Sequence, residues 1–120
     1  MAYSNIPLIA SGILYTDTDL VGTAIAVKAS SAVLYEAELD NTANAAASYF
    51  KAYNTAVGSV TVGTTVPDMV VMVPASVKIT LVLPSGVTFG TALTVCATTA
   101  GGTAGSTGPT SDFAVKLVYV

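Results

Sequence analysis

The run that starts at Asp17 has the first features of a calcium-binding loop. Asp17 and Asp19 supply oxygens at the first and third positions, and a glycine follows at the sixth. Val21 stands at the fifth position, where an oxygen ligand is needed. Lys28 stands at the twelfth, where such loops have a bidentate glutamate. The run therefore predicts a solvated turn, with no metal site.

A second acidic group, Glu36, Glu38 and Asp40, shares one face if the segment is an extended strand. Side chains two positions apart on a strand lie about 6.6 Å apart, within the range of carboxylate separations in glycosidases. With Tyr49 and Tyr53 as stacking platforms, the Glu36 and Glu38 edge could also bind a sugar. Any Glu-x-Glu strand gives this spacing, so we expect an exposed acidic edge that discourages unwanted strand pairing. A hydrolase and a sugar-binding module remain alternatives.

Nucleophilic catalysis has little support in the residue types. The chain has no histidine to activate a nucleophile, and Cys96 lies in the mostly apolar run 93–98, where a small buried thiol is expected. The glycine-rich run 101–108 lacks the lysine of a phosphate-binding loop, so we expect a flexible or partner-contacting surface loop there. The residues predict a protein that is not an enzyme and uses no cofactor.

The composition points to contact with other proteins. Only 9% of the 120 residues are charged, against about 25% in soluble domains, and arginine is absent. Low charge weakens the repulsion that keeps molecules apart. We therefore expect much of the surface to lie against another protein.

Two other classes of partner are disfavoured. The net charge of −3 and four scattered lysines provide no basic stripe for nucleic acid. The long uncharged stretch 79–111 is interrupted by proline and glycine, unlike a membrane span, and no basic region precedes an apolar run at the start as in a signal peptide. We expect neither nucleic acid nor membrane as a partner.

Alternating apolar residues predict a chain of short strands separated by turns. Residues 31–39 and 77–83 alternate best, although a helix over 28–39 is an alternative because alanine and glutamate favour one. Residues 69–73 are apolar on both faces, which is typical of a central buried strand. Turns are expected at 40–44 and 84–86. The expected strands are 21–27, 31–39, 48–53, 69–73, 77–83, 91–98 and 113–119.

These strands predict an all-β chain that forms one antiparallel β-sandwich or jelly roll over residues 1–120. Residues 1–12 are a possible N-terminal arm that reaches onto a neighbour, and a first edge strand is the alternative there. Tyrosine is enriched at protein interfaces, and apolar side chains at a terminus favour being tied down. The candidate interface residues are Tyr3, Ile6, Pro7, Leu8, Ile9, Tyr49 and Tyr53.

Five short motifs occur in an order that resembles small virion proteins of tailed bacteriophages, the capsid decoration or cement proteins. They are SYFKAYN at 48–54, VGTTVP at 62–67, VPA at 73–75, PSGVTFG at 84–90 and LTVCATT at 93–99. Together they cover about the last two-thirds of the chain. The first 45 residues carry no motif of this kind, and the loop before the last strand has Asp112 alone where relatives often have paired aspartates.

The resemblance implies a β-sandwich that decorates or cements a phage head. It also implies a homotrimer that sits between subunits of the major capsid protein, on the capsid surface of a virion assembled from proteins made in the host bacterial cytoplasm. A tail, baseplate or fibre component is the alternative within the same class.

Overall fold

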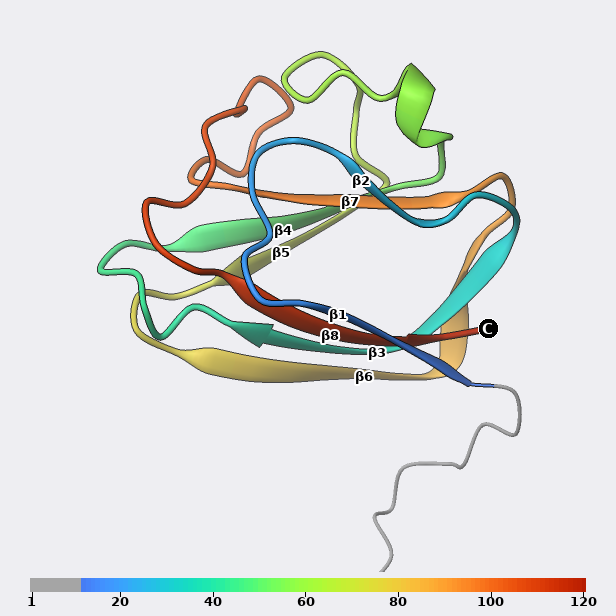
Figure 1. Ribbon diagram of the computed structural model, residues 1–120, viewed down its shortest axis with the longest axis horizontal. Coiled ribbons are helices and arrows are strands. Elements are labelled where there is room, and N and C mark those ends of the chain that lie inside the picture. The colour runs from blue at the N-terminus through green and yellow to red at the C-terminus, as the bar shows by residue number, and fades with distance from the viewer. Residues whose placement is uncertain (1–11) are drawn as a thin grey trace, which may run out of the picture.

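Eight strands form two antiparallel sheets of four strands each in the computed structural model, which describes residues 12–120 (Figure 1). Sheet A has the order β1 (Ile13–Asp17), β8 (Ala114–Tyr119), β3 (Ala32–Asp40) and β6 (Lys78–Phe89). Sheet B has the order β2 (Ile25–Lys28), β7 (Leu93–Thr98), β4 (Ser48–Tyr53) and β5 (Met69–Val73).

The pairing of the strands identifies the architecture. Strand β1 pairs with β8, β2 with β7, β3 with β6 and β4 with β5, as in one long hairpin that has been rolled into two layers. The pairs of β8 with β3 and of β7 with β4 complete the two sheets. This order of eight strands is that of a jelly roll. The expected all-β sandwich or jelly roll is confirmed.

The core lies between the two sheets and is built from alternate side chains of each strand. Leu34 and Leu39 of β3 and Leu117 of β8 meet Phe50 of β4 and Val95 of β7, and all five are fully buried. Burial of each such side chain contributes about 1.5–3 kcal/mol. The period-two pattern therefore fixes which face of each sheet points inward.

Most of the expected strands are present. Strands β4 and β5 have the predicted bounds, and β3, β7 and β8 differ from the prediction by one or two residues at an end. Residues 32–40 form β3 and not the alternative helix. The strand expected from Val21 begins only at Ile25, and β1 was not predicted.

The turn expected at 84–86 is wrong, because β6 continues through it as a large, irregular bulge. Leu34 pairs with Val87 and Glu36 with Val82, so that the residues 83–86 lie opposite Tyr35 alone. The irregularity also shifts the alternation of β3. Its buried positions are Ala32, Leu34, Ala37 and Leu39, whereas unbroken alternation puts 33, 35, 37 and 39 on one face.

The position expected for residues 69–73 is also wrong. Strand β5 is at the edge of sheet B and pairs, within residues 12–120, only with β4. The side chains of Val70 and Met72 point away from the core and are 42% and 51% exposed. A sequence suited to burial on both faces is therefore covered on one face only.

Gly86 makes the bulge possible, which yields a test. Its φ is 72°, and a Cβ at this position would lie 3.0 Å from the Tyr35 ring and still closer to a methyl group of Val33. We expect Gly86→Ala to lower the free energy of unfolding by roughly 1–3 kcal/mol in urea denaturation. Gly90→Ala is the control, because nothing lies within 4 Å of the added Cβ. Equal stability of the two variants would show that the bulge does not depend on Gly86.

Candidate assembly surface

The outer face of sheet B is covered by two long loops, residues 54–68 and residues 99–113, which we call the roof loops. Thr94, Cys96 and Thr98 of β7 alternate with the core residues and point away from the core, yet all three are fully buried. Figure 1 shows both roof loops above the layer that contains β2 and β7, including the short helical turn η1 (Val57–Ser59). The centre of sheet B, which is β7 together with Lys51 and Tyr53 of β4, is thus packed on both faces.

Lys51 of β4 fastens one roof loop to the sheet. Its side chain points outward from the core, is fully buried, and donates hydrogen bonds from Nζ to the carbonyl oxygens of Gly102 and Gly105 at 2.8 and 2.9 Å. In the described part of the chain Lys51 forms no ion pair. Burial lowers the pKa of this amine below its usual value, with a smaller opposing effect from Cys96.

Further contacts hold the roof loops closely against the sheet. The Thr94 hydroxyl donates to the Thr55 carbonyl at 2.6 Å, and the Thr98 hydroxyl donates to the Ala100 carbonyl at 2.8 Å. Gly101 lies against the ring of Tyr49, where a Cβ would come within 2.7 Å of it. The run 101–108, expected as a flexible or partner-contacting loop, is therefore packed by specific contacts.

Tyr53 is corrected as a candidate interface residue, because it is fully buried within the single chain. Its hydroxyl lies 3.6 Å from the Sγ of Cys96, which is itself a buried free thiol, as expected. Burial raises the pKa of the Tyr53 phenol and of the Cys96 thiol. Both groups are thereby kept protonated, which suits packing better than nucleophilic chemistry.

Of the other candidate interface residues, Tyr49 is half-buried beneath Gly101. The remaining candidates lie outside the described residues, and they are Tyr3, Ile6, Pro7, Leu8 and Ile9.

Sheet A has a different outer face, which carries charge. The sequence has eleven charged side chains, four lysines and seven carboxylates. Five of them lie on the outer face of sheet A. Lys116 Nζ lies 4.0 Å from Glu38 Oε1, and hydrogen bonds from Thr42 hold the pKa of Asp40 below its usual value. The five are Glu36, Glu38, Asp40, Lys78 and Lys116.

The structure separates the residues that suggested a sugar site. Glu36 and Glu38 lie on the outer face of sheet A, whereas Tyr49 and Tyr53 belong to sheet B on the other side of the core. The stacking platform and the acidic edge therefore do not share a site.

The acidic run after β1 forms a turn. The Asp17 side chain accepts a hydrogen bond from the backbone N–H of Asp19 at 2.9 Å, and the Tyr15 hydroxyl donates to its other oxygen at 3.4 Å. Across residues 12–120, no three histidine, cysteine or acidic side chains cluster in a way that could hold a metal ion. None of the helices in that range is long and apolar enough to cross a membrane.

The side of the molecule formed by sheet B and the roof loops, which we call the sheet-B side, is poor in charge. The roof loops carry one charged residue each, Asp68 and Asp112, and β7 and β5 carry none. Apolar side chains are exposed there, with Val57 at 41% and Val66 at 70%; sheet A also exposes Leu14, at 61%, so the two sides differ in charge and not in apolar exposure. The sheet-B side is therefore the candidate surface for contact with another protein.

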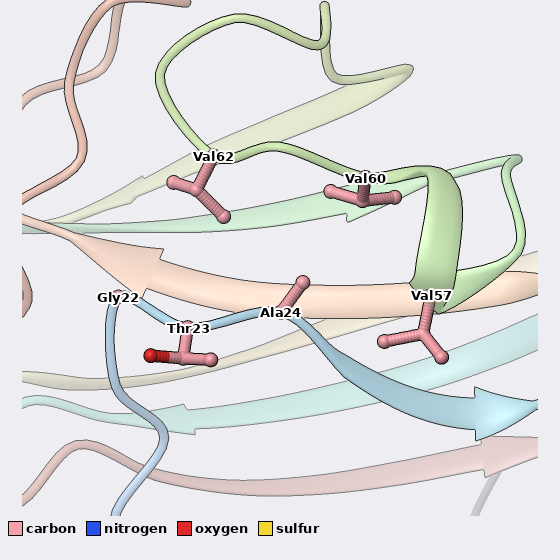
Figure 2. Close-up of a pocket in the computed structure, with 6 residues that line it drawn as sticks. All are labelled: Gly22, Thr23, Ala24, Val57, Val60 and Val62. Atoms are coloured by element: carbon pink, nitrogen blue, oxygen red, sulfur yellow. The ribbon is translucent and has the colours of Figure 1, made fainter.

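A hollow of about 310 Å³ opens on the sheet-B side between the segment before β2 and the first roof loop. Figure 2 shows three valines of the roof loop facing this segment across the hollow. Its lining residues are Gly22, Thr23, Ala24, Val57, Val60 and Val62. An apolar side chain of a partner would fit this lining better than a charged group.

Comparison with known protein families, characterised proteins and solved structures finds no match for this chain.

The buried role of Lys51 was missed by sequence reasoning. The signal was present, because Lys51 is an isolated charge on a strand whose neighbours Tyr49 and Tyr53 share its face. A lysine on an outward face normally indicates solvent. Only the course of the second roof loop reveals the carbonyl oxygens that bind it.

The lowered pKa of Lys51 predicts a pH dependence of stability. An unfolded lysine keeps its proton up to the usual pKa of 10.5, while the folded protein releases it at a lower pH. Between the lower pKa of the folded state and the pKa of 10.5 of the unfolded state, the unfolded state binds more protons. The unfolding free energy therefore rises with pH in this range. We expect the unfolding free energy of the parent protein, minus that of Lys51→Met, to increase from about pH 7 to about pH 9.5 in urea titrations.

Both proteins carry Cys96→Ser in this comparison, because burial raises the pKa of the Cys96 thiol and Lys51 lowers it in part, so that removal of Lys51 would change that titration as well. A difference that stays constant or falls with pH would contradict a buried lysine at this position.

Proposed function

We propose that the protein is a capsid decoration or cement protein of a tailed bacteriophage, which stabilises the head by protein–protein contacts. The observation that carries the proposal is the uneven distribution of charge. The outer face of sheet A bears five charged side chains, whereas the sheet-B side exposes valines and has few charges. A protein with one charged and one neutral side is suited to lie on a larger assembly with its charged side in water.

The physical basis is selective binding to the assembled shell. Contacts made only with the assembled state shift the equilibrium towards it by mass action. Neutral side chains such as those of Val57 and Val66 add favourable burial without the cost of removing charges from water. A jelly roll is also an architecture of viral capsid domains, although the fold alone does not assign a function.

In this proposal the partners are copies of the chain itself, as a homotrimer, and the major capsid protein. The protein acts on the capsid surface of the virion without catalysing a reaction and without a cofactor, nucleic acid or membrane. Threefold closure fits a protein that sits between capsid subunits, because cyclic contacts form closed rings.

A tail, baseplate or fibre component would use the same neutral surface. Labelling of the virion, followed by electron microscopy, separates the two locations, since label on the head supports the proposal and label only on the tail overturns it. The sugar-binding alternative is disfavoured by the separation of Glu36 and Glu38 from the two tyrosines.

The experiment for the proposal is co-sedimentation of the purified protein with expanded phage heads. We expect the parent protein to bind, and Val57→Lys to bind at least about tenfold more weakly, because a charge is buried in the contact. Val82→Lys is the matched control, since Val82 has similar exposure (37% against 41%) but lies on sheet A. Absence of binding by the parent protein, or equal loss in both variants, would reject the proposed surface.

A further inference from the structure

Strand β5 is an edge strand with the composition of an interior one. Its five residues are all valine or methionine, and no charged residue occurs from Met69 to Val77. Its inward side chains, Met69 and Val71, pack on the core, while Val70 and Met72 are exposed. Within residues 12–120 the backbone of β5 is paired on one side only, with β4. Such an edge is a template for another strand.

The other three edge strands of the sandwich carry features that prevent pairing with a further strand. Strand β6 contains Pro84 and the irregular bulge, β2 is bulged and ends at Lys28, and β1 ends at Asp17. Proline, bulges and charges are the devices by which natural sheets block edge pairing. Strand β5 contains none of these devices within its five residues, although Asp68 and Pro74 lie just outside its ends. Its apolar edge is therefore open along the strand, which indicates that it is covered in the working protein.

We propose that the edge of β5 pairs with β5 of a second copy of this chain, antiparallel and across a two-fold axis at Val71. In this arrangement only valine and methionine side chains lie opposite each other along the whole strand. Val71 lies opposite the partner's Val71, Val70 lies opposite the partner's Met72, and Met69 lies opposite the partner's Val73. The two exposed side chains of each copy then cover those of the other, as cross-strand pairs do within a sheet.

The surroundings of β5 favour a second copy as the occupant. A two-fold contact places a group near the axis close to its own equivalent, so a charge there would lie near a like charge. The neighbouring charges are already engaged, since Lys51 is buried against Gly102 and Gly105, and Asp68 accepts a hydrogen bond from the Asn54 N–H at 2.7 Å. Neither opposes self-pairing.

Apolar side chains beyond the strand extend the contact. Val66 and Val77 lie just outside the two ends of β5 and are 70% and 37% exposed. In an antiparallel pair, Val66 of one copy comes towards the partner's Val77. Pairing joins the two B sheets into one sheet of eight strands. Main-chain hydrogen bonds then supply affinity, and the apolar side chains supply fit.

This inference goes beyond the proposed function and does not depend on it. A two-fold contact gives an even number of chains, namely a dimer or, where threefold contacts form as well, a hexamer made of two trimers. A monomer could still bind a phage head through the rest of the sheet-B side, so the two proposals fail separately.

Native mass spectrometry of the full chain tests the number of copies. The parent protein is expected as a dimer or hexamer, and Val70→Lys is expected to halve that mass because it places a lysine on each strand of the pair. Val82→Lys, on the edge strand β6, is expected to keep the parent mass. A parent protein with an odd number of chains, or a Val70→Lys variant with unchanged mass, would overturn the proposal.

Two variants identify the occupant. Val70→Cys combined with Met72→Cys is expected to give a disulfide-linked dimer on oxidation, because these exposed residues lie opposite each other across the pair at about 4.5–5.5 Å between Cα atoms. Leu8→Lys is expected to leave the mass unchanged. No cross-link through residues 70 and 72, or a halved mass in Leu8→Lys, would show that another segment covers β5 and would overturn the proposal.

Discussion

Burial of the centre of sheet B on both faces is the constraint on which the rest of the structure depends. Strand β7 is buried along its whole length, with core residues on one face and Thr94, Cys96 and Thr98 on the other. Such burial requires that the chain close over the outer face, and the two roof loops do so. Lys51 completes the closure by giving two loop carbonyls a donor, since unpaired polar groups beneath a loop are costly.

The same arrangement places most charged side chains on one side of the protein. A roof made of glycine, threonine, alanine and valine can lie closely over the sheet, but it leaves that side of the protein almost uncharged. Sheet A has no such roof in the described residues, and its outer face carries glutamates, an aspartate and lysines that interact with water and with each other. One chain thus presents a charged side to water and a nearly uncharged side to a partner. This is the physical reason to expect that the protein binds its partner in one orientation.

Sequence periodicity was sufficient for much of this fold and failed at identifiable places. Strands β4 and β5 were predicted with their bounds because each is a short, regular run. The bulge was missed because Pro84 and Gly86 have the composition of a turn, and only the pairing of β6 with β3 on both sides of Tyr35 shows that the strand continues. Tyr53 was misplaced for a related reason, since alternation places it away from the core but does not show the covering loop. The edge position of β5 required the strand order, which local pattern does not contain.

The most direct test of the central claim, that the sheet-B side is the contact surface, is amide hydrogen exchange followed by mass spectrometry on the protein free and bound to phage heads. The account predicts slower exchange on binding in the roof loops, with the outer strands β1 and β6 of sheet A unchanged. Slower exchange confined to β1 and β6, with the roof loops unaffected, would contradict it.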